Sequence, residues 1–71
     1  SPAAEEVAGT LSPQETRLLA LIAAGSSYRE AAVELDVSIN TVRTHIRSIY
    51  EKLQVHTKSE AVAKAMRSGL I

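Results

Sequence analysis

Residues 27–53 contain two stretches of helical periodicity that are joined by a very short turn. In the second stretch the aliphatic residues recur at steps of three and four, which places them on one side of an α-helix. These residues are Ile39, Val42, Ile46, Ile49 and Leu53. The turn leaves no room for another element, so the segment predicts two consecutive helices, the second over residues 38–53 with one buried side.

The opposite side of that second helix is polar. On the same projection it carries Asn40, Arg43, Thr44 and Arg47. Guanidinium, carboxamide and hydroxyl groups are those that hydrogen-bond base edges in the major groove of DNA. A recognition helix uses its N-terminal residues for such contacts, and Ser38 is a natural N-cap just before this cluster. The segment therefore predicts a helix that enters a DNA groove.

Three further helix starts are marked by capping boxes of the S/T-x-x-E form, at Ser12, Ser27 and Thr57. They predict helices over 13–24, 28–35 and 58–68, with Pro13 at a first position and with Gly25 and Gly69 after two of the ends. No run alternates as a half-buried strand would. We expect one all-α domain of four helices over residues 11–71.

The first ten residues, SPAAEEVAGT, show no periodicity and combine Pro, Gly and Ala with two Glu. This composition is typical of a linker or of a tag remnant. We expect residues 1–10 to be disordered.

Composition narrows the classes of function. The chain has no Cys, which excludes disulfides and thiolate metal sites, and we expect no metal and no cofactor. The two His are not arranged with a nucleophile and a base, and no phosphate-binding loop is present, so we expect no enzyme. Nothing resembles a signal peptide or a membrane span, and a cytoplasmic protein fits.

The formal net charge is zero, whereas nucleic-acid binders are usually basic. The charges are unevenly distributed, however. From residue 1 to 36 the acids outnumber the bases, whereas from 37 to 59 four bases accompany the single acid Glu51. The bases of that second region are Arg43, Arg47, Lys52 and Lys58. The positive field is modest, so we expect one copy to bind DNA weakly and dimerisation to matter.

From Leu11 to Ile71 the chain resembles the LuxR-type (GerE-like) DNA-binding domain of NarL/FixJ response regulators and quorum-sensing regulators. The resemblance lies in the order of short motifs along the whole segment. They are Leu11-Ser12 with Glu15 and Leu19, Ala24-Gly25, Glu30 with Ala32, Leu35, Val37-Ser38, Thr41-Val42-Arg43 with His45, Lys52-Leu53, Val55, Lys58 and Gly69-Leu70. Gln54 stands where the family usually has Gly.

The resemblance implies a four-helix, LuxR-type helix-turn-helix domain, the C-terminal effector of a bacterial transcription regulator such as a two-component response regulator. Its third helix would lie in the major groove of double-stranded DNA, with RNA polymerase a candidate partner. By position, the base-facing residues would be Arg43, Thr44 and Arg47. Candidate DNA backbone contacts are Asn40, Thr41, Lys58, Tyr28 and Lys52.

The helix over 58–68 carries small and apolar residues over a wide arc, namely Ala61, Val62, Ala65 and Met66. Such a helix is either buried on two sides or meets a partner. We expect a two-fold homodimer through this surface.

Two other functions remain open. A region-four domain of a sigma factor also binds promoter DNA through a helix-turn-helix, although its basic C-terminal run is missing here. In a helical protein-interaction module, the basic helix would be only a solvated surface, on which Arg47 and Glu51 would form an i,i+4 ion pair. Salt-dependent affinity for duplex DNA distinguishes a DNA-binding domain from that module.

Overall fold

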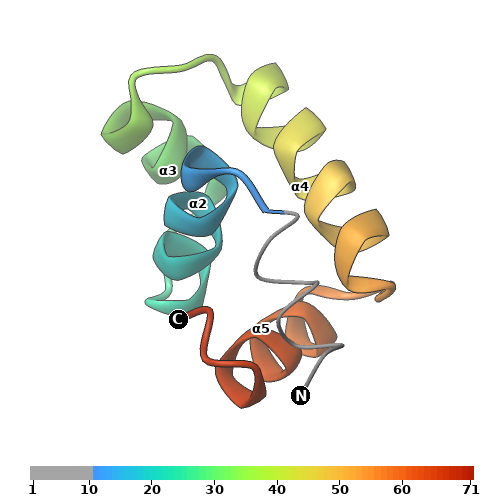
Figure 1. Cartoon of the computed structure of the whole chain (residues 1–71). Helices are drawn as coiled ribbons and strands as arrows, with labels where there is room; N and C mark the ends of the chain where they lie inside the picture. Colours follow the sequence, from blue (N-terminus) through green and yellow to red (C-terminus); the bar gives the residue numbers. More distant parts are fainter. Residues whose placement is uncertain (1–10) are drawn as a thin grey trace.

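The computed structural model describes residues 11–71 as four α-helices, and these residues form no strand. The helices are α2 (Pro13–Ala23), α3 (Tyr28–Leu35), α4 (Ile39–Leu53) and α5 (Lys58–Arg67), as Figure 1 shows. The predicted all-α fold is confirmed, and each helix begins and ends within one residue of its predicted position. The predicted linker over 1–10 lies outside the described residues.

Side-chain caps start all four helices. Ser12 and Ser27 form complete capping boxes with Glu15 and Glu30, in which each hydroxyl accepts a backbone N–H and each carboxylate accepts the N–H of the cap residue. Ser38 Oγ accepts from Thr41 N at 3.1 Å, and Thr57 Oγ1 accepts from Glu60 N at 3.1 Å. A cap of this kind contributes about 1 kcal/mol, which matters in so small a domain.

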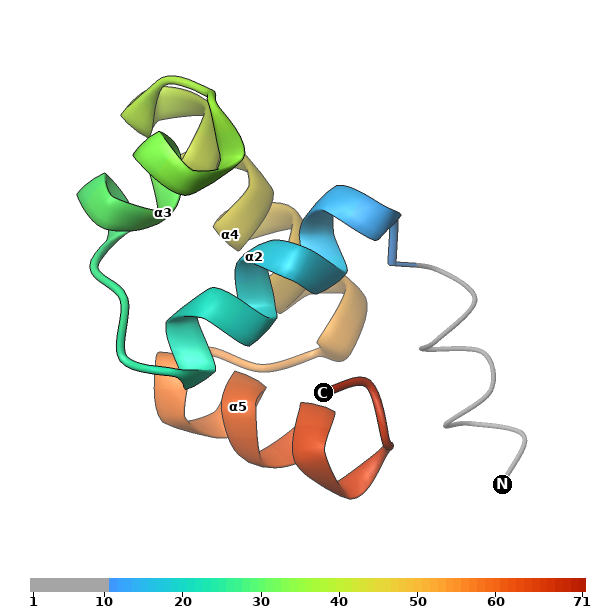
Figure 2. The same ribbon diagram turned by 90° about the vertical axis from the view of Figure 1, so that its left-hand side faces the viewer.

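The core lies where α2, α3 and α5 surround the inner side of α4. Its largest fully buried side chains are Leu18, Leu19, Val42, Ile49 and Leu53. Helix α4 packs against each of the other three, and α5 also touches α2. In Figure 2, α5 lies across one end of the molecule and α3 lies at the other, with α2 and α4 between them. The predicted buried side of α4 is confirmed, except that Ile39 at its start is only half-buried.

Asp36 and Gln54 follow α3 and α4 in the left-handed conformation, with φ of 57° and 58°. Helices often end with such a residue, and glycine is preferred there because other residues have a Cβ that crowds the backbone. Gln54 nevertheless adopts the conformation for which the family uses Gly. The turn from α4 into α5 therefore contains a residue whose Cβ crowds the backbone.

The structure corrects the predicted role of two alanines in α5. Ala61 and Ala65 are 1% and 0% exposed, because this side of α5 packs against α2 and α4. Neither side chain can reach a second copy of the chain. Of the four predicted dimer residues, Val62 is half-buried and Met66 is 64% exposed. Only these two remain available for contact with a second copy.

Candidate nucleic-acid interface

The outer side of α4 presents the polar cluster that the sequence predicts. Asn40, Arg43, Thr44 and Arg47 are all exposed, whereas Val42 and Ile49 on the reverse are completely buried. The helix is fixed by its aliphatic side, so the polar residues are held at constant positions on one rigid element. The two guanidinium groups are thus displayed to solvent within about one helical turn of each other.

Neither guanidinium is used inside the domain. Within residues 11–71 the one ion pair joins Lys52 to Glu15, and no hydrogen bond there involves the Arg43 or Arg47 side chain. The i,i+4 pair between Arg47 and Glu51, which a merely solvated helix surface would favour, is absent from this part of the chain. Both arginines can donate all their N–H groups to a ligand.

The threonines and the asparagine at the start of α4 differ in how many of their side-chain hydrogen-bonding groups are already engaged. Thr44 Oγ1 donates to the carbonyl of Asn40 at 3.1 Å, so its oxygen remains as an acceptor. Thr41 is half-buried and its hydroxyl bonds the hydroxyl of the Ser38 cap at 2.9 Å. Thr41 therefore stabilises the helix start, while Asn40 and Thr44 face solvent.

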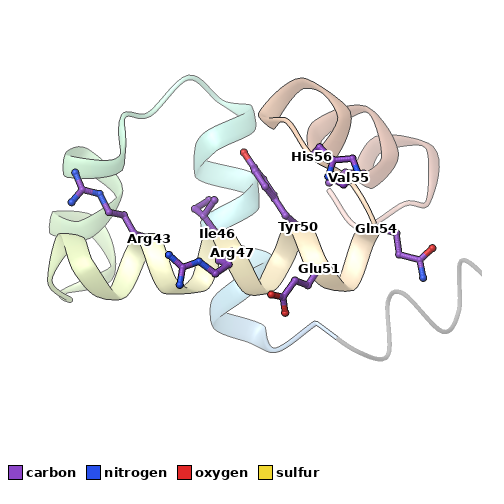
Figure 3. Close-up of a pocket in the computed structure, with 8 residues that line it drawn as sticks. All are labelled: Arg43, Ile46, Arg47, Tyr50, Glu51, Gln54, Val55 and His56. Carbon is purple, nitrogen blue, oxygen red and sulfur yellow. The ribbon is translucent and has the colours of Figure 1, made fainter.

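A shallow groove of about 660 Å³ runs along the arginine side of α4 to the loop before α5. Figure 3 shows the eight residues that line it, which are Arg43, Ile46, Arg47, Tyr50, Glu51, Gln54, Val55 and His56. The groove is open to solvent and its two arginines both come from α4. The same lining also contains the carboxylate of Glu51 and the apolar side chains of Ile46 and Val55.

The family model for "Bacterial regulatory proteins, luxR family" matches residues 9–65 of the chain. The chain belongs to the LuxR family. The match covers all of α2, α3 and α4 and most of α5, and therefore includes the two helices joined by the short turn.

Two bacterial regulators are similar to this LuxR-family domain in sequence. The "Probable transcriptional regulatory protein NarL" of Mycobacterium tuberculosis is 46% identical over 68 residues, which are 96% of this chain and 32% of that protein. The "HTH-type transcriptional regulator MalT" of Yersinia pestis is 46% identical over 57 residues, which are 80% of this chain and 6% of that protein. The chain thus spans a third or less of the length of these relatives.

A solved structure, that of the transcription factor GerE, is similar in fold. It superposes with a TM-score of 0.81 at 30% sequence identity, and the match covers 84% of this chain and 90% of that chain. The four-helix LuxR-type helix-turn-helix architecture predicted from the sequence is confirmed.

Lys52 is engaged in an ion pair inside the LuxR-family domain. Its ammonium nitrogen is 2.7 Å from Glu15 Oε1, and the carboxylate is almost fully buried. Burial raises the pKa of Glu15, but the hydrogen bonds from Lys52 and from the Ser12 backbone outweigh it, and the pKa is lowered from 4.5 to about 2. Lys52 therefore neutralises a buried acid, and its ammonium is engaged within the domain.

Tyr28 and Lys58 occupy the first positions of α3 and α5. Lys58 is exposed, as a phosphate contact requires. Tyr28 is half-buried and packs on the core, and its hydroxyl interacts with that of Tyr50. Burial and the hydrogen bond with Tyr28 raise the pKa of Tyr50 to about 12. Tyr28 thus links α3 to the middle of α4, and its hydroxyl is already engaged within the domain.

Sequence reasoning missed a second lysine that acts inside the domain. Lys64 Nζ on α5 donates to the carbonyl of Leu53 at 2.7 Å, at the C-terminal end of α4. A cation there satisfies an orphan carbonyl and opposes the negative end of the helix dipole. Lys64 lies 11 residues after Leu53, so no local pattern pairs the two, and the contact depends on how α5 packs.

Residues 11–71 contain no cluster of three or more His, Cys, Asp or Glu side chains that could hold a metal. In the same residues, no helix has the length and hydropathy of a membrane span.

Proposed function

We propose that this domain binds double-stranded DNA sequence-specifically, as the C-terminal effector of a bacterial transcription regulator with α4 in the major groove. One observation carries the proposal, namely that Arg43 and Arg47 are exposed and have no ion-pair partner within residues 11–71, while the reverse side of α4 is buried in the core. The names of NarL and MalT, both transcriptional regulators, support it.

Base readout is assigned to Arg43, Thr44 and Arg47. A free guanidinium can donate two parallel hydrogen bonds to O6 and N7 of guanine, which is the commonest specific contact in the major groove. Thr44 supplies a hydroxyl acceptor and a methyl group, so it can face an amine or the thymine methyl. All three side chains are exposed on α4.

Backbone contacts are assigned to Asn40, Thr41, Tyr28 and Lys58. All four lie in the first turn of a helix, where backbone N–H groups and the positive end of the dipole favour phosphate. Lys58 adds a full charge at the start of α5. Lys52 is not proposed, since moving its ammonium to a phosphate would leave the carboxylate of Glu15 buried without its cation.

Pairing of two copies is proposed through Val62 and Met66 on α5. They are four residues apart, about one helical turn, and Met66 is 64% exposed. A two-fold dimer would place two α4 helices on paired half-sites, which raises the affinity of a weakly basic domain. For a regulator of this kind RNA polymerase is a candidate partner, and the cytoplasm is the expected location. No catalytic role is proposed.

Selection of bound duplexes from a random pool, followed by a gel-shift titration over salt concentration, tests the proposal. We expect an enriched half-site sequence, often found in pairs at fixed spacing, and an affinity that falls steeply with salt. An interaction module would give neither. Absence of salt-dependent affinity for any duplex would therefore refute DNA binding.

A further inference from the structure

An exposed carboxylate lies in line with the basic residues of α4. Glu51 is four residues after Arg47 and seven after Thr44, so at ~100° per residue the three side chains share one side of the helix. Glu51 is exposed and lines the same groove as the two arginines. In Figure 3 its side chain points away from that of Tyr50, into open solvent.

No cation of the described residues neutralises this carboxylate. The ion pair within residues 11–71 is that of Lys52 with Glu15, and Lys64 is engaged with the Leu53 carbonyl. The free charges on the outer side of α4 are thus two guanidinium groups and one carboxylate. Glu51 halves the net positive charge that α4 presents to an approaching anion.

In the proposed binding mode, Glu51 lies beside phosphates rather than bases. Asn40 to Arg47 spans ~10 Å along the helix axis, close to the ~12 Å width of the major groove. Glu51 is ~6 Å further along, where a helix that reads bases with its first two turns leaves the groove. A carboxylate at that point faces the sugar–phosphate backbone, whose charge repels it.

We propose that Glu51 limits the affinity of the domain for DNA of any sequence, by opposing the phosphates that flank the major groove. The proposal rests on the proposed DNA-binding function. A domain weakened in this way depends on a second copy for stable binding, so occupancy of isolated, unrelated sites is reduced.

Glu51→Gln removes the charge and keeps the shape of the side chain. The test is the affinity of this variant for a labelled random-sequence duplex of about 24 base pairs. Fluorescence anisotropy measures this affinity at about 50 and 200 mM salt. We expect binding about three- to tenfold tighter than wild type at the lower salt, and a log–log salt slope that is steeper by up to about one unit.

Glu34→Gln on α3 is the matched control, because it makes the same change of net charge at another exposed glutamate. We expect less than about a twofold effect from it, and unchanged thermal unfolding for both variants. Equal gains in the two variants, no gain, or weaker binding by Glu51→Gln would each overturn the proposal. If wild type itself shows no salt-dependent binding, it is the proposed function that fails.

Discussion

A single oxygen of Glu15 joins the start of α2 to the last turn of α4. Oε1 accepts the Ser12 backbone N–H at 2.8 Å and the Lys52 ammonium at 2.7 Å. The Glu15 side chain is 5% exposed, so both contacts are made largely out of water. The same residue therefore caps one helix and fixes the position of the proposed recognition helix against it.

Replacing Glu15 by Gln keeps the capping acceptor and removes the charge that Lys52 neutralises. We expect the free energy of unfolding to fall by about 1–2 kcal/mol, because the charge pairing is lost but the Lys52 side chain, which is 34% exposed, can still be solvated. Urea unfolding measures this. Glu30→Gln is the control, since Glu30 caps α3 in the same geometry but is exposed, and we expect a clearly smaller loss from it. Equal losses in both variants would show that capping alone matters.

The lowered pKa of Glu15 predicts acid sensitivity. The folded domain holds this carboxyl at a pKa of about 2, below the value of 4.5 for the unfolded chain. The stabilisation is therefore complete above about pH 5 and is lost as the pH falls through about 2. We expect the difference in unfolding free energy between wild type and Glu15→Gln to shrink over this range. A difference that stays constant from about pH 7 to pH 3 would contradict the assigned pKa.

Gln54 and Gly69 both have a positive φ, but we expect substitutions at the two positions to change the stability of the fold in opposite directions. Gln54 has a φ of 58°, so Gln54→Gly should relieve crowding at its Cβ and stabilise the fold by about 0.5–1 kcal/mol. Gly69 has a φ of 75° and no atom within 4 Å of the position a Cβ would take, so Gly69→Ala should cost about 1 kcal/mol through the backbone alone. Thermal unfolding compares the two, and a destabilised Gln54→Gly variant would show that the Gln54 side chain is needed.

Local signals in the sequence predict most of this fold. The caps at Ser12, Ser27, Ser38 and Thr57 each act within three residues, so they are readable without knowing the tertiary structure. The exposed side of α4 is equally readable, because the aliphatic period fixes which residues remain outside.

The parts that were missed depend on contacts between helices. Glu15 and Lys52 are 37 residues apart, and no local pattern pairs them. The periodicity of α5 shows an apolar arc, but not that Ala61 and Ala65 fill the space beside α2 and α4 while Met66 stays outside. The predicted dimer surface therefore included two alanines that are buried in the core.

The affinity of Arg43→Ala for the duplex selected by the wild-type domain tests the central claim most directly. We expect the binding free energy to weaken by about 1–3 kcal/mol, roughly 5- to 150-fold in affinity, with relaxed specificity at one base pair. Arg17→Ala, on the exposed side of α2, is the control and should change the affinity little. Full-strength binding by a folded Arg43→Ala protein would contradict the assignment of α4 as the helix that reads DNA.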